Sequence, residues 1–262
     1  MGETVADSVL AGYLREAEAD SATLGLVLHG SRAAGCATAE SDYDLERVLT
    51  DDAFRDGEAR GALDLPKTRL PGGVIVDLWF TCPEKLRAQA GKFDWETPAY
   101  ATAKVLFDRT GEVAELIRAI AQVPAETAER EVPFWFDGYL NAFYRSLKAY
   151  RRGNELGARL QAAESVMHLM RTLFMMAGIW TPYHDRLMHH IDTLAVQGWD
   201  PPALKGALLE ILRTADPHLQ IELEEQVERL LCDRGFGKVI DDWEGELERA
   251  KAWYVSLESP AP

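Results

Sequence analysis

The spacing of apolar residues changes character near the middle of the chain. Up to about residue 124, short apolar runs alternate with amphipathic stretches, which is typical of strands interleaved with helices. The predicted strands are Leu24–Leu28, Tyr43–Thr50, Val74–Phe80 and Ala103–Phe107. The predicted helices of this part are residues 1–20, Pro83–Ala90 and Glu112–Gln122.

The remainder of the chain keeps a helical period, and we expect no further strand there. The predicted helices are Thr127–Arg152, Leu156–Ala177, Thr181–Val196, Pro201–Arg213, Asp216–Asp233 and Asp241–Leu257. An α/β part followed by an all-α part indicates two domains, because each pattern needs its own packing partner. We place them at residues 1–124 and 125–262.

Composition and charge narrow the class of protein. No apolar run among the 262 residues approaches the roughly 20 needed to span a bilayer, and the N-terminal stretch lacks the basic and apolar regions of a signal peptide. We therefore expect a cytoplasmic protein with no membrane contact. Cys36, Cys82 and Cys232 are expected to be free thiols. The formal net charge of −15 disfavours nucleic acid and favours cationic small molecules, although it also serves solubility.

The clearest chemical signal is a Gly-Ser pair after the first strand, followed ten residues later by two aspartates. Gly30 lets the backbone approach a ligand closely, Ser31 adds a hydroxyl donor, and the N–H groups of the following turn favour phosphate. Asp42 and Asp44 are two residues apart at the start of a predicted strand, and in an extended backbone their carboxylates share one face. Such carboxylates repel each other unless a cation lies between them, and Mg²⁺ accepts their oxygens together with those of phosphate.

Asp77 is the third acid of the predicted site. It is the only charged residue in the apolar run Val74–Phe80, where an unpaired carboxylate would be costly. A metal site completed by Asp42, Asp44 and Asp77 gives it a role and suits a two-metal transfer to phosphorus. The alternative is an ion pair with an arginine.

These motifs resemble those of the polymerase-β-type nucleotidyltransferase superfamily, and more closely the small bacterial antibiotic (aminoglycoside-type) nucleotidyltransferases. The resemblance covers roughly Leu24 to Phe80 and rests on Leu26–Gly35, Ser41–Leu45 and Val76-Asp77. It implies an N-terminal domain with a mixed sheet and helices, a C-terminal helical bundle, and substrates held between them. It implies ATP as the donor and two Mg²⁺ ions. The residues that it implies for the triphosphate are Gly30, Ser31 and Arg32, and those for metal are Asp42, Asp44 and Asp77.

The helical part resembles the same enzymes more loosely, at Tyr144–Lys148, Ala162–Ser165 and Trp180–Tyr183. In the last stretch, relatives carry an arginine before the proline and a lysine after the tyrosine. Thr181 and Asp185 stand nearby in this chain instead.

Three further residues of the helical part are candidates for the site. Arg145 and Lys148 are three apart in a basic stretch that continues with Arg151 and Arg152, and they form either a clamp for a triphosphate or a solvated face. Glu164 lies in an apolar context and is either a general base or a structural ion-pair partner. Two rival bases follow the third strand, Asp94 and Glu96. The histidines at 168, 184, 189 and 190 show no recognised metal spacing.

We therefore expect a nucleotidyltransferase that moves a nucleoside monophosphate, AMP from ATP, onto a hydroxyl of a small molecule. The hydroxyl attacks the α-phosphorus in line and pyrophosphate leaves. The acidic charge favours a hydroxylated, cationic acceptor such as an aminoglycoside, and antibiotic resistance is one candidate role. Two alternatives stay open, a protein-modifying (AMPylating) enzyme and a non-catalytic nucleotide-binding module. The sequence leaves the oligomeric state open.

Overall fold

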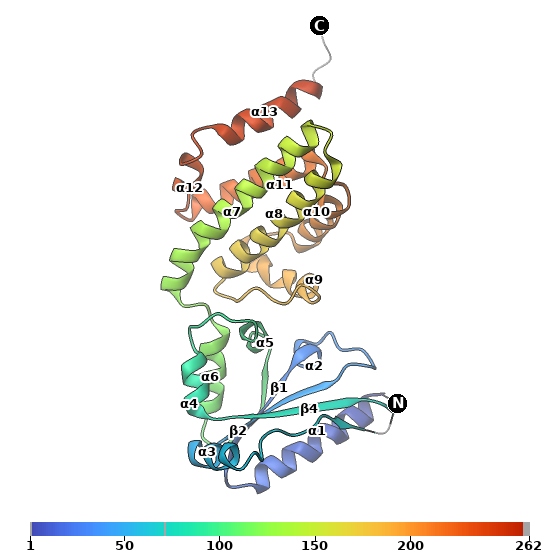
Figure 1. Cartoon of the computed structure of the whole chain (residues 1–262), viewed down its shortest axis with the longest axis vertical. Coiled ribbons are helices and arrows are strands. Elements are labelled where there is room, and N and C mark those ends of the chain that lie inside the picture. The colour runs from blue at the N-terminus through green and yellow to red at the C-terminus, as the bar shows by residue number, and fades with distance from the viewer. Residues whose placement is uncertain (1, 71, 259–262) are drawn as a thin grey trace. The chain divides into compact units, whose positions relative to one another are not determined.

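The computed structural model describes residues 2–70 and 72–258, with side chains from Ser8 to Tyr254 apart from residue 71. Two compact units make up the chain (Figure 1). The first comprises Met1–Val123 and the short segment Pro182–Arg186, and the second comprises Pro124–Thr181 and Leu187–Pro262. Met1 and residues 259–262, at the outer limits of the two domains proposed from the sequence, lie outside the described residues.

The first unit is built on a five-stranded sheet with the order β3-β4-β2-β1-β5. The strands are β1 (Thr23–His29), β2 (Tyr43–Leu49), β3 (Thr68–Arg69), β4 (Ile75–Thr81) and β5 (Lys104–Asp108). Strands β2 and β4 are parallel, while the other three neighbouring pairs are antiparallel. The sheet is therefore mixed, and the predicted α/β class of this part is confirmed.

Six helices of the first unit surround this sheet among the described residues. They are α1 (Gly2–Ala19), α2 (Gly30–Ala34), α3 (Asp51–Ala59), α4 (Pro83–Gln89), α5 (Thr97–Tyr100) and α6 (Glu112–Ala121). The sequence pattern did not predict α3, α5 or β3. Helix α5 has four residues and β3 has two, and segments this short carry no detectable period.

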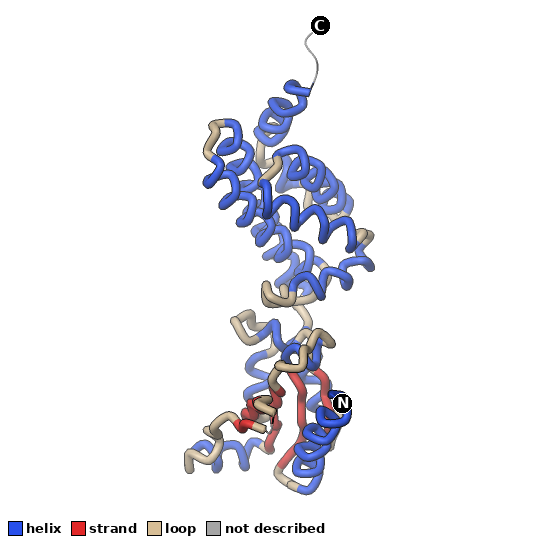
Figure 2. Tube along the Cα trace, turned by 90° about the vertical axis from the view of Figure 1, so that its right-hand side faces the viewer, coloured by secondary structure: helices blue, strands red, loops and turns tan. Residues whose placement is uncertain are grey.

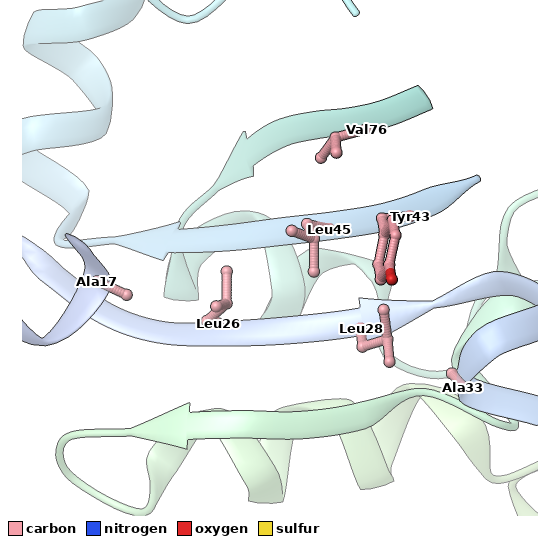
Figure 3. Close-up of a cluster of buried hydrophobic side chains, with 7 residues drawn as sticks. All are labelled: Ala17, Leu26, Leu28, Ala33, Tyr43, Leu45 and Val76. Atoms are coloured by element: carbon pink, nitrogen blue, oxygen red, sulfur yellow. The ribbon is translucent and has the colours of Figure 1, made fainter. Parts of the chain in front are cut away.

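The two faces of the sheet are used differently. Figure 3 shows one face, where apolar side chains of β1, β2 and β4 meet Ala17 of α1 and Ala33 of α2. The strand residues of this cluster are Leu26, Leu28, Tyr43, Leu45 and Val76. On the opposite face, α4 and α6 cover only part of the sheet, packing on Val27 and Val48. The rest of that face carries polar side chains and forms the candidate site described below.

The second unit is helical throughout its described residues, in contrast to the first unit, which holds the strands (Figure 2). Its helices are α7 (Ala125–Arg151), α8 (Glu155–Met176), α9 (Leu187–His190), the 3₁₀-helix Ile191–Gln197, α10 (Pro201–Thr214), α11 (Pro217–Asp233), α12 (Lys238–Asp241) and α13 (Glu246–Glu258). The predicted all-α character of this part is confirmed. No described helix is long and apolar enough to cross a bilayer.

Two predicted helices differ from the structure. The helix expected to begin at Thr181 begins at Leu187, because residues 182–186 form a loop that packs with the first unit. The helix expected over Asp241–Leu257 begins only at Glu246, as α13, because Glu244 and Gly245 have φ angles of 49° and 73° and separate it from α12. Positive φ angles cannot continue a right-handed helix.

Helix α13 is attached to the bundle through polar contacts of Lys251 and Tyr254. Lys251 Nζ donates to Glu224 Oε2 of α11 at 2.9 Å, and both side chains are almost fully buried. Tyr254 donates its hydroxyl proton to the carbonyl oxygen of Leu147 at 2.5 Å. Burial of Glu224 raises its pKa to about 7, because the interior of the bundle disfavours the charged form of the carboxyl group.

Candidate active site

Strand β1 is followed directly by a glycine that no other residue could replace without movement of its surroundings. Gly30 has a φ of +71°, and a Cβ built on it would lie 1.9 Å from Oδ2 of Asp44 on β2. The absence of a side chain thus lets the backbone at the start of α2 pass directly against a carboxylate. This close approach explains the glycine of the Gly30-Ser31 pair.

Asp44 and Asp77 lie side by side across the parallel pair of strands. Asp44 is in register with Asp77 on β4, and on its other side with His29 at the end of β1. Residues paired in this way share one face of a sheet. The two carboxylates and Gly30 line a cavity of about 480 Å³. Its other lining residues are His29, Trp79, Trp95, Glu96, Ala99, Tyr100, Tyr183 and Arg186.

The surroundings of Asp44 oppose its negative charge. Burial raises the pKa of its carboxyl group, and the nearby charges of Asp77 and Asp42 raise it further, while Arg186 acts in the opposite direction. A group in this setting gains from any added cation, because a cation removes the repulsion among the three acids.

Lys67 provides one such cation in the structure. Its Nζ lies 2.6 Å from Oδ2 of Asp77, so this acid pairs with a lysine, and its side chain is 31% exposed rather than buried as the apolar run had suggested. The hydrogen bond and charge of Asp77 raise the pKa of Lys67, and the charges of Asp42 and Asp44 add to the effect. Carboxylate oxygens are the donors that Mg²⁺ binds, and two such groups, those of Asp44 and Asp77, are in register here. No three His, Cys, Asp or Glu side chains in the described part of the chain are close enough together to hold a metal ion.

The spacing of Asp42 and Asp44 had suggested that both lie on one strand, but only Asp44 does. Strand β2 begins at Tyr43, and Asp42 lies in the loop before it. The guanidinium of Arg32 explains the difference, because its Nε and Nη2 donate to the carbonyl oxygens of Ser41 and Asp42 and occupy groups that a strand would pair. Arg32 also stacks on the ring of Tyr43, 4.0 Å from its centroid, and thereby fixes this loop to β2.

A buried polar pair, His29 and Glu46, was not recognised in the sequence, and one member of it, His29, lines the cavity. Glu46 is 1% exposed, and its two oxygens accept hydrogen bonds from His29 Nε2 at 2.8 Å and the Tyr100 hydroxyl at 3.0 Å. Because a carboxylate can only accept, Nε2 carries the proton of this bond, and Nδ1 has no hydrogen-bond partner within the described residues. Glu46 follows Asp44 by two residues, so the strand period already placed both acids on one face.

The loop before α5 is organised by Asp94, one of the two acids weighed as a rival base. Its Oδ1 accepts from the backbone N–H groups of Glu96 and Thr97, at 2.9 and 3.0 Å, and its Oδ2 accepts from Gln89 at 2.6 Å. Burial raises the pKa of Asp94, but the bonds from Gln89, Thr97 and Glu96 outweigh it and leave the pKa lowered. Asp94 therefore holds the loop, whereas Glu96 lines the cavity.

Arg186 is the second feature that the sequence did not reveal. It lies in the segment Pro182–Arg186, which follows α8 in sequence but packs with the first unit. Tyr183 fixes this segment by donating its hydroxyl proton to the carbonyl oxygen of Trp95 at 2.6 Å. Among the described residues that line the cavity, Arg186 is the one with a permanent positive charge. Only the structure could place this charge beside Asp44, because the segment is remote in sequence.

The remaining candidates of the helical part lie within the second unit. Arg145 and Glu164 line a cavity of about 290 Å³ between α7 and α8, and Arg145 and Lys148 line another of about 390 Å³. Arg145 Nε donates to Asn141 at 2.6 Å, and Lys148 Nζ lies 4.7 Å from the ring centroid of Tyr144. Glu164 accepts a bond from Gln161 at 3.0 Å and lies 3.8 Å from Nε2 of His168.

Comparison with known proteins adds two similarities. A family model described as a domain of unknown function (DUF4037) matches residues 97–186, a segment that begins with α5 and ends at Arg186. No curated protein matches the chain. A solved structure of a nucleotidyltransferase-like protein from Exiguobacterium sibiricum is similar at a TM-score of 0.39 with 15% sequence identity, over 95% of this chain and 79% of that one. A TM-score of this size does not by itself establish a shared activity, so the functional case rests on the geometry of the site.

Proposed function

We propose that this protein is a nucleotidyltransferase that transfers a nucleoside monophosphate, AMP from ATP, to a hydroxyl group of a small molecule with the help of Mg²⁺. The observation that carries the proposal is the junction of Gly30, Asp44 and Asp77, where a backbone without a side chain meets two carboxylates in register. A triphosphate needs a close backbone approach, and its metal needs carboxylates beside it.

Each element of this junction has a part in binding. Gly30 and Ser31 bind the triphosphate through backbone N–H groups and a hydroxyl, and Arg186 neutralises charge on its oxygens. Asp42, Asp44 and Asp77 would hold up to two Mg²⁺ ions, which would supply charge neutralisation at the reacting phosphorus. Lys67 would compete with such an ion for the carboxylate of Asp77.

The transfer itself is an in-line displacement. The acceptor hydroxyl attacks the α-phosphorus, the bond from that phosphorus to the bridging oxygen of pyrophosphate breaks, and a carboxylate takes the hydroxyl proton. Asp77 is the favoured base because it shares the cavity with Gly30 and Asp44. Glu164, with its hydrogen bond from Gln161, is the alternative base. Arg145 and Lys148, on α7, are proposed to bind the phosphate chain.

The acceptor proposed for this site is hydroxylated and cationic, as an aminoglycoside is. Asp44, Asp77 and Glu96 line the cavity, and the chain carries a formal net charge of −15, so a cation is attracted both locally and at long range.

A labelling screen tests this proposal. Purified protein is incubated with Mg²⁺, each α-³²P-labelled nucleoside triphosphate and pools of hydroxylated amines, and both pyrophosphate and labelled products are measured. We expect label on a small molecule with the wild type and with Asp52→Asn, whose side chain is 95% exposed, but not with Asp44→Asn. Label on an added protein would favour the protein-modifying alternative. Nucleotide binding without transfer to any acceptor would favour a binding module.

A further inference from the structure

The cavity that contains Gly30 and Asp44 continues into a wall of aromatic rings for which the proposed chemistry has no use. We propose that this wall, formed by Trp79, Trp95, Tyr100 and Tyr183, binds the base of the donor nucleotide by stacking, with Trp95 as the main contact. The inference rests on the proposed function, because it assigns the triphosphate of the same nucleotide to Gly30.

The loop that carries Trp95 is held in place by many bonds. Asp94 accepts two backbone N–H bonds from the residues just after Trp95, and the side chain of Thr97 is fully buried. The backbone of Trp95 is fixed from the other side, because its carbonyl oxygen accepts the hydroxyl proton of Tyr183 at 2.6 Å. A loop fixed from two directions presents its side chain in a defined position.

The Trp95 side chain nevertheless stays 75% exposed. A large aromatic surface left in water by an ordered loop at the rim of a cavity is suited to a ligand, because covering it releases the water on both surfaces. Phe93 in the same loop is 61% exposed but is not among the residues that line the cavity. The two side chains therefore form a matched pair, one inside and one outside the proposed site.

The inner part of the wall is supported by the buried pair of His29 and Glu46. The ring of His29 lies 5.2 Å from that of Trp79 and 5.0 Å from that of Tyr100, and Glu46 holds both His29 and Tyr100 by hydrogen bonds. These bonds limit the motion of the rings, so less side-chain conformational entropy is lost when a ligand binds.

The distribution of charge in the cavity indicates whether the nucleobase or the cationic acceptor binds to this wall. The acids Asp44 and Asp77 lie at the Gly30 end of the cavity, while the wall consists of uncharged rings with Glu96 beside them. A planar, uncharged nucleobase fits such rings, and stacking on an aromatic side chain tolerates any base. A polycationic acceptor fits the carboxylates instead. The cavity volume of about 480 Å³ is within the usual range for sites that hold a molecule of this size.

The test separates the base from the phosphates. The full-length wild type, Trp95→Ala and Phe93→Ala are titrated calorimetrically with α,β-methylene ATP and with inorganic tripolyphosphate, both in the presence of Mg²⁺. We expect Trp95→Ala to weaken nucleotide binding at least about tenfold, equivalent to about 1.4 kcal/mol, and to leave tripolyphosphate binding unchanged. Phe93→Ala should change neither. Tyr183→Phe keeps the ring but loses the bond to the Trp95 carbonyl, and we expect it to weaken only the nucleotide.

The possible outcomes distinguish this inference from the proposed function. Equal nucleotide affinity in the wild type and Trp95→Ala would overturn the stacking site, and the function would stand if tripolyphosphate still bound. The same conclusion would follow if Trp95→Ala weakened a cationic acceptor but not the nucleotide. Failure of the wild type to bind either phosphate compound would overturn the function and the inference together.

Discussion

Replacement of Gly30 by alanine tests the contact on which the site is built. The added methyl group would have to occupy space 1.9 Å from Oδ2 of Asp44, so the carboxylate or the backbone must move. Gly35 provides the matched control, because it ends the same short helix with a φ of +79° and a Cβ there would meet no atom within 4 Å. Both substitutions strain the backbone, but only the first displaces Asp44.

The magnitudes follow from these two terms. A left-handed conformation costs an L-residue about 1–2 kcal/mol, which is the expected loss for Gly35→Ala. Overpacking adds about 1–3 kcal/mol, so Gly30→Ala should cost about 2–5 kcal/mol. In an Asp44→Ala background the extra term should vanish, because the nearest remaining atom of residue 44, its Cβ, is 3.4 Å away.

Unfolding in urea, followed by hydrogen exchange of peptides from β1 and β2, measures these values for the first unit. Triphosphate binding is measured in parallel, and we expect Gly30→Ala to weaken it while Gly35→Ala leaves it intact. Equal losses of stability and equal binding in the two variants would refute the proposed contact between Gly30 and Asp44.

Substitutions at three other positions probe the charges of the two units. Because burial raises the pKa of Asp44, the folded chain holds the proton of this carboxyl group more tightly than the unfolded chain does, and the protein loses stability as the pH rises above the ordinary pKa of 3.8. Asp44→Asn should therefore stabilise the ligand-free protein at pH 7 but not near pH 3, as measured by urea titration. Glu46→Ala should cost about 1–3 kcal/mol, because it leaves His29 Nε2 buried without an acceptor, and Glu46→Gln should restore most of this in the same assay. Lys251→Met should destabilise the helical unit by about 3–5 kcal/mol at pH 8, because it leaves the buried carboxylate of Glu224 without its cation. The loss should be smaller at pH 5, because burial raises the pKa of Glu224 to about 7 and a protonated carboxyl group needs no cation. Equal losses at the two pH values would contradict this.

The sequence predicted the elements of the fold better than their pairing. The apolar runs that became β1, β2 and β4 were found because their side chains are buried on at least one face. The parallel pairing of β2 with β4, which sets Asp44 beside Asp77, depends on contacts between distant segments and has no local pattern. Local pattern also placed Asp42 in the strand, where Arg32 prevents it.

The residues missed at the site were missed for different reasons. Glu46 has the same two-residue spacing from Asp44 that drew attention to Asp42, and the strand period alone could have identified it. Arg186 and Lys67 lie in loops, whose positions are set by tertiary contacts such as the bond from Tyr183 to Trp95. No periodicity in the sequence carries that information.

The most direct test of the proposed function is the effect of Asp77→Asn on binding and turnover in the same preparation. The substitution keeps the shape of the side chain and its capacity to hydrogen-bond, but it removes the charge that Lys67 or a metal ion neutralises. We predict that nucleotide affinity stays within about tenfold of the wild type, a change of under about 1.4 kcal/mol, while transfer falls at least about a hundredfold. A folded Asp77→Asn protein that binds nucleotide and transfers it at the wild-type rate would contradict the three-carboxylate mechanism.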